Sequence, residues 1–262
     1  MEYSECNSYR FIDFRIEGTT GILELNSPNN RNALCKEMMH ELIHFFESTQ
    51  QDASFTTLIL KGKDHFFSSG ADLNWMLEAT QKELPQNIRD AKLFHHLYYS
   101  QNNYLKPIIC MVEKGAYGGA IGLMACSDVV LCDQNSSFAF SEVRLGLVPA
   151  MVMPFILAKT GHSAGRRWMV TGAVFSENEA KAIGLVHEIL PVDMLFAECL
   201  KLAENIGKNS AHAMAKTKQL LHYHQQTNID ETDRIIFSAK TIALARTSTD
   251  GIARVNSFLT NR

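Results

Sequence analysis

The sequence predicts an α/β core in residues 1–195, followed by a helical C-terminal region in residues 196–262. Up to Pro191, short apolar or alternating segments typical of strands recur between segments with helical periodicity. Beyond Pro191 the apolar residues keep a helical spacing almost to the end of the chain. A length of 262 residues is sufficient for one large domain with a helical appendage.

Composition and charge restrict the class of protein. Apolar residues make up 46% and charged residues 20% of the chain, which is ordinary for a globular enzyme or binding domain. The net charge is −3 without a long basic run, so we expect no nucleic-acid partner. No apolar run could span a bilayer, so we expect no membrane segment. Residues 1–6 show no secretory signal and the six cysteines form no C-x-x-C, which favours reduced thiols and a cytoplasmic location.

The N-terminal part of the chain predicts a hairpin and a helix. Residues 11–16 and 21–25 alternate apolar and polar side chains on either side of a short turn, as in a β-hairpin. After a turn-rich loop, residues 33–48 place Leu34, Met38 and other apolar side chains on one helical face.

The same helix contains the zinc-hydrolase pattern H-E-x-x-H at His40, Glu41 and His44. Two imidazoles one helical turn apart can bind zinc, with the glutamate as general base. Both histidines, however, lie opposite the apolar stripe, and the extended pattern would require glycine at Glu47 and histidine at Gln50. We therefore prefer a solvated polar face and keep the zinc hydrolase as an alternative.

A turn of interest follows the predicted strand at residues 56–60. Gly70 can turn the backbone sharply, which would point the peptide N–H of Ala71 into a cleft. The alternative is a plain β-turn in which Asp72 caps the next helix. Residues 75–105 have a helical pattern interrupted by Pro85, and we interpret their least apolar part, residues 81–87, as a candidate lid.

Residues 108–126 predict a strand that turns through glycines into a helix. An apolar run at residues 108–112 is followed by four glycines within eight residues and then by a helical segment from Ala120. Such a turn directs free backbone N–H groups and the positive end of a helix dipole at one point, which suits a developing negative charge. The phosphate-binding glycine motifs are absent from it. The alternative is close packing of helix on strand, which also needs small residues.

Glu142 is the only carboxylate between Gln134 and Ser176, and it follows a predicted strand at residues 137–140. Its sequence neighbours are mostly apolar, and desolvation would raise its pKa toward the range useful for proton transfer. The alternative is a surface salt bridge to Arg144 or another cation.

The remaining segments complete the expected architecture. Ser163 lies in a G-x-S-x-G pattern, but the preceding residues favour a helix over the strand that a nucleophile elbow requires. Ser176 begins a capping box, and residues 185–189 predict a last strand. Helices are then expected at residues 193–207, 211–223, 228–246 and 250–259, and their apolar side chains should pack on the core or on another subunit.

Five segments resemble, in order and spacing, the crotonase (enoyl-CoA hydratase/isomerase) superfamily. They are residues 30–34, 67–73, 115–120, 141–149 and 180–186, so the resemblance covers nearly the whole chain. It implies a spiral of ββα turns, a C-terminal helical region used in trimerisation, and a homotrimer or dimer of trimers. It also implies an acyl-CoA thioester substrate without a separate cofactor, since coenzyme A is part of the substrate.

The resemblance also implies roles for individual residues. The N–H groups of Ala71 and Gly119 would form an oxyanion hole, and Glu142 would be a catalytic glutamate. The second glutamate of typical hydratases would fall at Gly122. Glu142 would therefore serve both proton transfers of a hydration, or the reaction would be the proton shift of an enoyl-CoA isomerase. The residues expected to bind coenzyme A are Arg31, Ala33, Ser69, Gly70, Asp72, Leu73 and Gly118.

Within the superfamily, residues 70–76 and 141–150 look most like bacterial methylglutaconyl-CoA hydratases. We therefore expect hydration of a 2-enoyl-CoA, with methylglutaconyl-CoA as one candidate substrate. An isomerase is the alternative within the same fold. A non-catalytic acyl-CoA binder is a further alternative, besides the zinc hydrolase.

Overall fold

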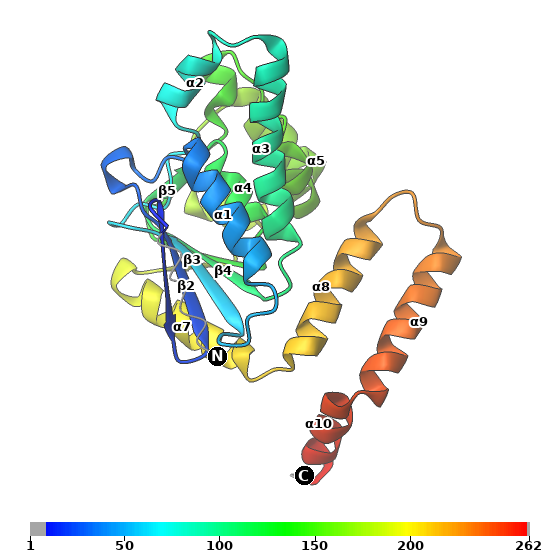
Figure 1. Ribbon diagram of the computed structural model, residues 1–262. Helices are drawn as coiled ribbons and strands as arrows, with labels where there is room; N and C mark the ends of the chain where they lie inside the picture. Colours follow the sequence, from blue (N-terminus) through cyan, green and yellow to red (C-terminus); the bar gives the residue numbers. More distant parts are fainter. Residues whose placement is uncertain (1–8, 261–262) are drawn as a thin grey trace.

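The computed structural model describes residues 9–260 as two β-sheets surrounded by helices (Figure 1). Residues 1–6, which bear on the secretory-signal prediction and include Cys6, lie outside the described part. The strands are β1 (Ile12–Glu17), β2 (Thr20–Leu25), β3 (Thr57–Gly62), β4 (Ile108–Val112), β5 (Gly115–Tyr117), β6 (Val129–Asp133), β7 (Ser137–Ala139), β8 (Phe175–Ser176) and β9 (Glu188–Leu190).

The larger sheet has the strand order β1-β2-β3-β4-β6-β9 and is parallel except for the β1–β2 hairpin. The smaller sheet has the order β5-β7-β8. Strand β4 lies in the larger sheet and the next strand, β5, in the smaller sheet, and a helix then follows. The same order recurs with β6 in the larger sheet and β7 in the smaller one. This alternation confirms the predicted spiral of ββα turns. The apolar run of β4 is buried along its whole length, as expected of a strand with covered faces.

The helices agree closely with the predicted segments. Where the sequence predicts one interrupted helix, α2 and α3 are separated by a turn, and Pro85 lies in the first turn of α3. The capping box at Ser176 is formed. The helices are α1 (Lys36–Ser48), α2 (Leu73–Ala79), α3 (Leu84–Asn102), α4 (Ala120–Ala125), α5 (Met153–Thr171), α6 (Glu177–Ala182), α7 (Val192–Gly207), α8 (Ala211–Gln225), α9 (Glu231–Thr247) and α10 (Thr249–Thr260), with the short 3₁₀ helices η1 (Pro28–Asn30) and η2 (Ser141–Leu145).

Two helical layers cover the larger sheet. The main apolar cluster joins one face of the sheet to α1, α3, α4 and α5. Helix α7 lies on the opposite face (Figure 1). There, Leu195, Cys199 and Ala203 pack against side chains of the central strands. The predicted domain division at residue 195 therefore falls inside a helix that packs on the sheet, and the division itself stays a prediction.

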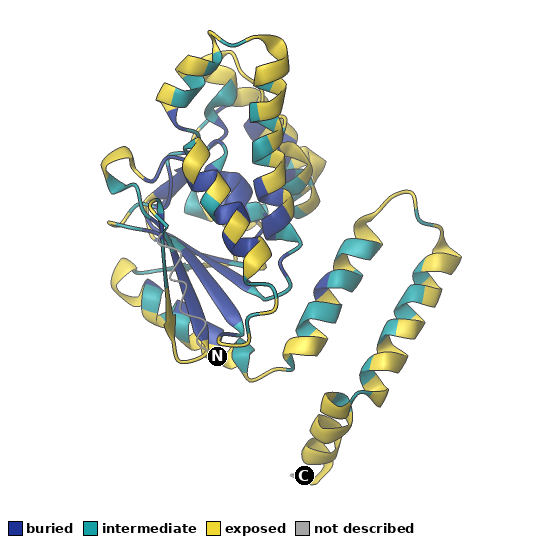
Figure 2. Cartoon of the chain, in the orientation of Figure 1, coloured by how far each residue is buried: buried dark blue, intermediate teal, exposed yellow. Residues whose placement is uncertain are grey.

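Helices α8–α10 form an arm that extends away from the core (Figure 1). Lys218 is the buried residue of α8 and ties the arm to the core. Its ammonium donates to the Asp128 carboxylate at 2.6 Å and to the Lys106 carbonyl at 3.1 Å. Much of the arm is exposed, as Figure 2 shows, and its exposed apolar side chains are Leu221, Ile235, Ile236, Ile242, Leu244, Ile252, Val255, Phe258 and Leu259.

The structure does not form a nucleophile elbow at Ser163. This serine lies inside α5, which continues from Met153 with a break at Gly161, where φ is 77° and ψ is 164°. Helix rather than strand precedes the serine, as the sequence indicates, so the elbow geometry is missing. Within residues 9–260, no helix combines the length and apolar character needed to cross a membrane.

Candidate active site

Ala71 has a free peptide N–H because its neighbours make the hydrogen bonds of a short parallel bridge. The Leu34 N–H donates to the Gly70 carbonyl at 2.7 Å, and the Asp72 N–H donates to the Leu34 carbonyl at 3.2 Å. In the described part of the chain, the Ala71 N–H has no acceptor. Gly70 adopts a φ of 91°, and a Cβ there would lie 2.4 Å from the Tyr117 carbonyl oxygen. Only glycine fits this close turn, as predicted.

Gly119 supplies a second free N–H close by. It is the N-cap of α4, and its N–H likewise finds no acceptor among residues 9–260. A Cβ built on Gly70 would lie 3.5 Å from the Gly119 nitrogen, so the two turns adjoin each other. The Gly119 carbonyl, in contrast, accepts a hydrogen bond of 2.8 Å from the Tyr98 hydroxyl. The two N–H groups predicted to form an oxyanion hole are therefore both available for a ligand.

Glu142 lies in η2, beside these turns. A Cβ built on Gly118 would lie 3.3 Å from its Oε1 atom, while its Oε2 atom is buried and has no hydrogen-bond partner among residues 9–260. Burial raises the pKa of the Glu142 carboxyl above its ordinary value. Across residues 9–260, no cation lies within ion-pair distance of this carboxyl, so the alternative of a salt bridge to Arg144 is wrong.

One cavity of about 340 Å³ joins these three residues. Its described lining contains two side chains with a titratable group, Glu142 and Tyr98, and no lysine, arginine or histidine. Such a cavity favours an apolar ligand whose polar end is held at few points. The full lining is Ala71, Met76, Ala91, Phe94, Tyr98, Gly119, Glu142, Leu147, Val148, Pro149, Ala150, Met151 and Val152.

The two loops predicted to bind coenzyme A are adjacent. The Ser69 N–H donates to the Arg31 carbonyl at 2.9 Å, and the Asn30 side chain donates to Asp72. Asp72 also accepts from the Trp75 N–H at 2.9 Å as the N-cap of α2, so the capping interpretation is confirmed. Among the other predicted residues, Leu73 is exposed, Ala33 is buried, and Gly118 adjoins Glu142. Contact of these residues with coenzyme A stays a prediction.

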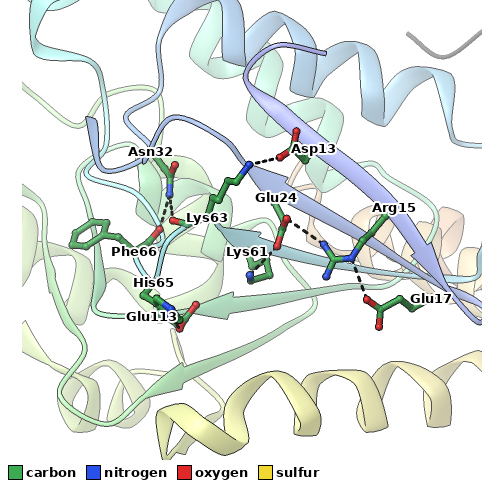
Figure 3. Close-up of polar contacts among 10 residues, drawn as sticks. All are labelled: Asp13, Arg15, Glu17, Glu24, Asn32, Lys61, Lys63, His65, Phe66 and Glu113. Carbon is green, nitrogen blue, oxygen red and sulfur yellow. Dashed lines mark hydrogen bonds and ion pairs between the residues drawn. The ribbon is translucent and has the colours of Figure 1, made fainter. Parts of the chain in front are cut away.

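Asn32 holds the first of these loops against the end of β3. Its side-chain amide donates to the Lys63 carbonyl at 2.9 Å and to the Phe66 carbonyl at 2.7 Å (Figure 3). The same view shows Lys63 paired with Asp13, which ties this corner to the β1–β2 hairpin. Asn32 is fully buried, and its φ of 53° is one that asparagine tolerates better than most residues. The loop is thus positioned by the protein itself.

Tyr98 is the site residue that sequence reasoning missed. A Cβ added to Gly122 would lie 2.4 Å from Tyr98 Cε1, 2.6 Å from Tyr98 Cζ and 2.7 Å from Val152 Cγ2. The tyrosine ring therefore occupies the space that a side chain at Gly122 would need. Burial raises the pKa of the Tyr98 phenol well above its ordinary value, and Cys126 and Glu142 add to the shift. Nothing in the helical pattern of α3 distinguishes Tyr98 from an ordinary core residue.

Two side chains of the H-E-x-x-H segment form hydrogen bonds with residues 9–11. Glu41 accepts hydrogen bonds from the backbone N–H groups of Arg10 and Phe11 at 2.9 and 2.8 Å. The His44 ring lies 2.9 Å from the Tyr9 hydroxyl. Within residues 9–260, no group of three or more histidines, cysteines or carboxylates is arranged to hold a metal ion. This geometry does not support the zinc-hydrolase alternative.

Comparison with known proteins agrees with the fold. Residues 15–245 match the family described as enoyl-CoA hydratase/isomerase. The 2,3-dehydroadipyl-CoA hydratase of Escherichia coli is 30% identical over 206 residues, covering 78% of this chain and 79% of that protein. The mitochondrial enoyl-CoA hydratase of Pongo abelii is 29% identical, covering 83% and 73%. The crystal structure of an enoyl-CoA hydratase from Shewanella pealeana superposes with a TM-score of 0.91 at 31% identity, covering 97% and 95%.

Proposed function

This chain belongs to the enoyl-CoA hydratase/isomerase family, and from that premise we propose that it adds water to the double bond of a 2-enoyl-CoA thioester. One observation carries the proposal. The Glu142 carboxyl, whose Oε2 atom is buried, lines the same cavity as Ala71 and Gly119; within residues 9–260 neither this Oε2 atom nor the N–H groups of Ala71 and Gly119 have a hydrogen-bond partner. A base beside an oxyanion site is the combination that addition to an unsaturated thioester requires.

The proposed reaction uses Glu142 twice. The two N–H groups bind the thioester oxygen, and Glu142 takes a proton from water as the water oxygen bonds to Cβ. The π electrons move toward the thioester, and the resulting enolate oxygen is stabilised by Ala71 and Gly119. Glu142 then returns its proton to Cα, the carbonyl reforms, and one water has been added. These steps use no metal or redox cofactor.

We propose an uncharged acyl chain as the preferred substrate. A distal carboxylate, as in methylglutaconyl-CoA, would enter a cavity whose described lining offers no cation. Burying an unpaired carboxylate is costly, so methylglutaconyl-CoA becomes the second candidate. Since the relative from Escherichia coli is named for a substrate of the dicarboxylic kind, a substrate panel should contain both classes.

Solvent oxygen distinguishes hydration from the alternative reaction, an isomerisation in which Glu142 moves a proton between two carbons. We expect the protein to convert crotonyl-CoA in ¹⁸O-labelled water into a 3-hydroxyacyl-CoA that carries one label, as measured by mass spectrometry. A 3-enoyl-CoA substrate that is converted to its 2-enoyl isomer without label would instead establish the isomerase. If the protein bound these substrates and converted neither, the result would support the alternative of a non-catalytic acyl-CoA binder.

We also propose that the protein is a homotrimer or a dimer of trimers. The arm α8–α10 exposes apolar side chains that its own core does not cover, and a partner subunit would bury them. Sedimentation velocity should therefore give a mass of three or six chains at micromolar concentration. A monomer under these conditions would contradict the proposal. The cytoplasmic location and the lack of a nucleic-acid partner remain predictions from the sequence.

A further inference from the structure

The cavity contains a second polar side chain, Tyr98, for which the reaction described above has no role. Glu142 and Tyr98 are the two lining side chains with titratable groups among the described residues. The Tyr98 hydroxyl is held at the Gly119 carbonyl, next to one of the two free N–H groups. An attacking water has two hydrogens, and Glu142 accepts only the one that it removes.

We propose that the oxygen of Tyr98 holds the second hydrogen of the attacking water, while Glu142 accepts the first. A water held by both hydrogens has its lone pair directed away from the two acceptors and toward Cβ of the substrate. This inference rests on the proposed hydration reaction. It makes Tyr98 a water-binding residue of the site rather than a proton donor.

Because the Tyr98 hydroxyl donates its hydrogen to the Gly119 carbonyl, it can bind a water only as an acceptor. A phenol has one O–H donor and lone pairs that accept. Its single hydrogen is donated to the Gly119 carbonyl at 2.8 Å, so only the lone pairs remain for a water. Since burial raises its pKa well above the ordinary value, the phenol stays neutral and adds no charge beside Glu142.

Packing fixes the position of the Tyr98 ring. Gly122 has no side chain, and the Cε1 and Cζ atoms of Tyr98 fill the space where a Cβ would lie. The ring also lies edge-on to Phe155, with ring centroids 5.6 Å apart, and its centroid lies 6.3 Å from that of the Phe94 ring. Gly122, Phe155 and Phe94 thus hold the ring from three sides, and a group that positions a water must be held rigidly in this way.

Tyr98→Phe tests the inference because it removes the hydroxyl and keeps the ring that packs on Gly122. We expect kcat for hydration of crotonyl-CoA to fall about 10²-fold with KM within about twofold of the wild type. Tyr104→Phe is the matched control, since it removes another buried hydroxyl, one bonded to Thr49 at 2.8 Å outside the cavity lining. We expect this control to hydrate at the wild-type rate.

Exchange of the α-protons of butyryl-CoA in D₂O provides the second readout. This exchange needs Glu142 and the two N–H groups but no attacking water, so Tyr98→Phe should retain it within about threefold of the wild type. Equal losses of exchange and hydration would show that Tyr98 merely supports the Gly119 peptide and would overturn the inference. Full hydration by Tyr98→Phe would also overturn it. Wild-type protein that exchanges α-protons but never hydrates would instead refute the proposed function.

Discussion

Glu142→Gln should lower kcat for enoyl-CoA hydration by about 10³-fold, the typical contribution of a positioned acid–base group. Glutamine keeps the size of the side chain but cannot accept a proton from water. The loss should appear in kcat because the two N–H groups proposed to bind the thioester oxygen are untouched. Steady-state kinetics with crotonyl-CoA and a binding measurement with butyryl-CoA check both parts.

The same substitution should stabilise the fold at neutral pH. Burial raises the pKa of Glu142 above its value in the unfolded chain, so folding favours the protonated form. The stability gained from protonation is present below the unfolded pKa and is lost as pH rises through the folded pKa. Near pH 7 the charged carboxylate therefore destabilises the fold, and Glu142→Gln should add on the order of 1 kcal/mol to the free energy of unfolding.

Urea denaturation at two pH values tests this sign. Near pH 7 Glu142→Gln should unfold at higher urea than the wild type, and the difference should shrink as the pH falls below the ordinary glutamate pKa of about 4.3, where Glu142 becomes protonated in both states. Glu204→Gln, at an exposed position of α7, is the matched control and should change neither stability nor turnover. An activity profile that does not rise with pH through the raised pKa of Glu142 would argue against its role as the base.

Gly122→Glu, which would restore the second glutamate of typical hydratases, should destabilise the protein by about 2–3 kcal/mol. The Cβ of any side chain at this position would lie 2.4 Å from the Tyr98 ring and 2.7 Å from Val152. Both neighbours are buried and packed, so neither can move without cost. Urea denaturation measures the loss, and we expect hydration to fall rather than rise.

Gly122→Ala separates the steric effect from the effect of charge. Because the conflict begins at Cβ, alanine should reproduce most of the destabilisation caused by glutamate. Combining Gly122→Ala with Tyr98→Leu should recover part of it, since the two residues compete for the same space. A stable and more active Gly122→Glu protein would show that the ring moves freely and would contradict this account of the site.

Local chemistry made much of the site predictable. Gly70 and Asp72 are recognisable in the sequence because a sharp turn and a helix cap each have a residue signature. Glu142 is recognisable because a lone carboxylate among apolar neighbours in sequence tends to be desolvated. In each case the physical reason lies within a few residues of the chain.

The rest of the site depends on contacts between distant segments. Tyr98 and Gly122 are 24 positions apart in the numbering, on α3 and α4, and only the packing of those helices brings the ring over the glycine. The sequence shows glycine at position 122 in place of the second glutamate, but it does not show that the Tyr98 ring fills the space beside this glycine. Likewise, the helical periodicity of α7 matches that of the C-terminal helices, and only its packing on the sheet distinguishes it from them.

If the protruding arm α8–α10 mediates the proposed oligomerisation, the stability of the protein depends on its concentration. Apolar helix faces that are buried only in the oligomer become exposed when dilution shifts the equilibrium toward single chains. The melting temperature should accordingly climb as the protein is concentrated. A cell that makes little of this enzyme would then hold it in a more fragile form, open to proteases at the helices of its C-terminal end.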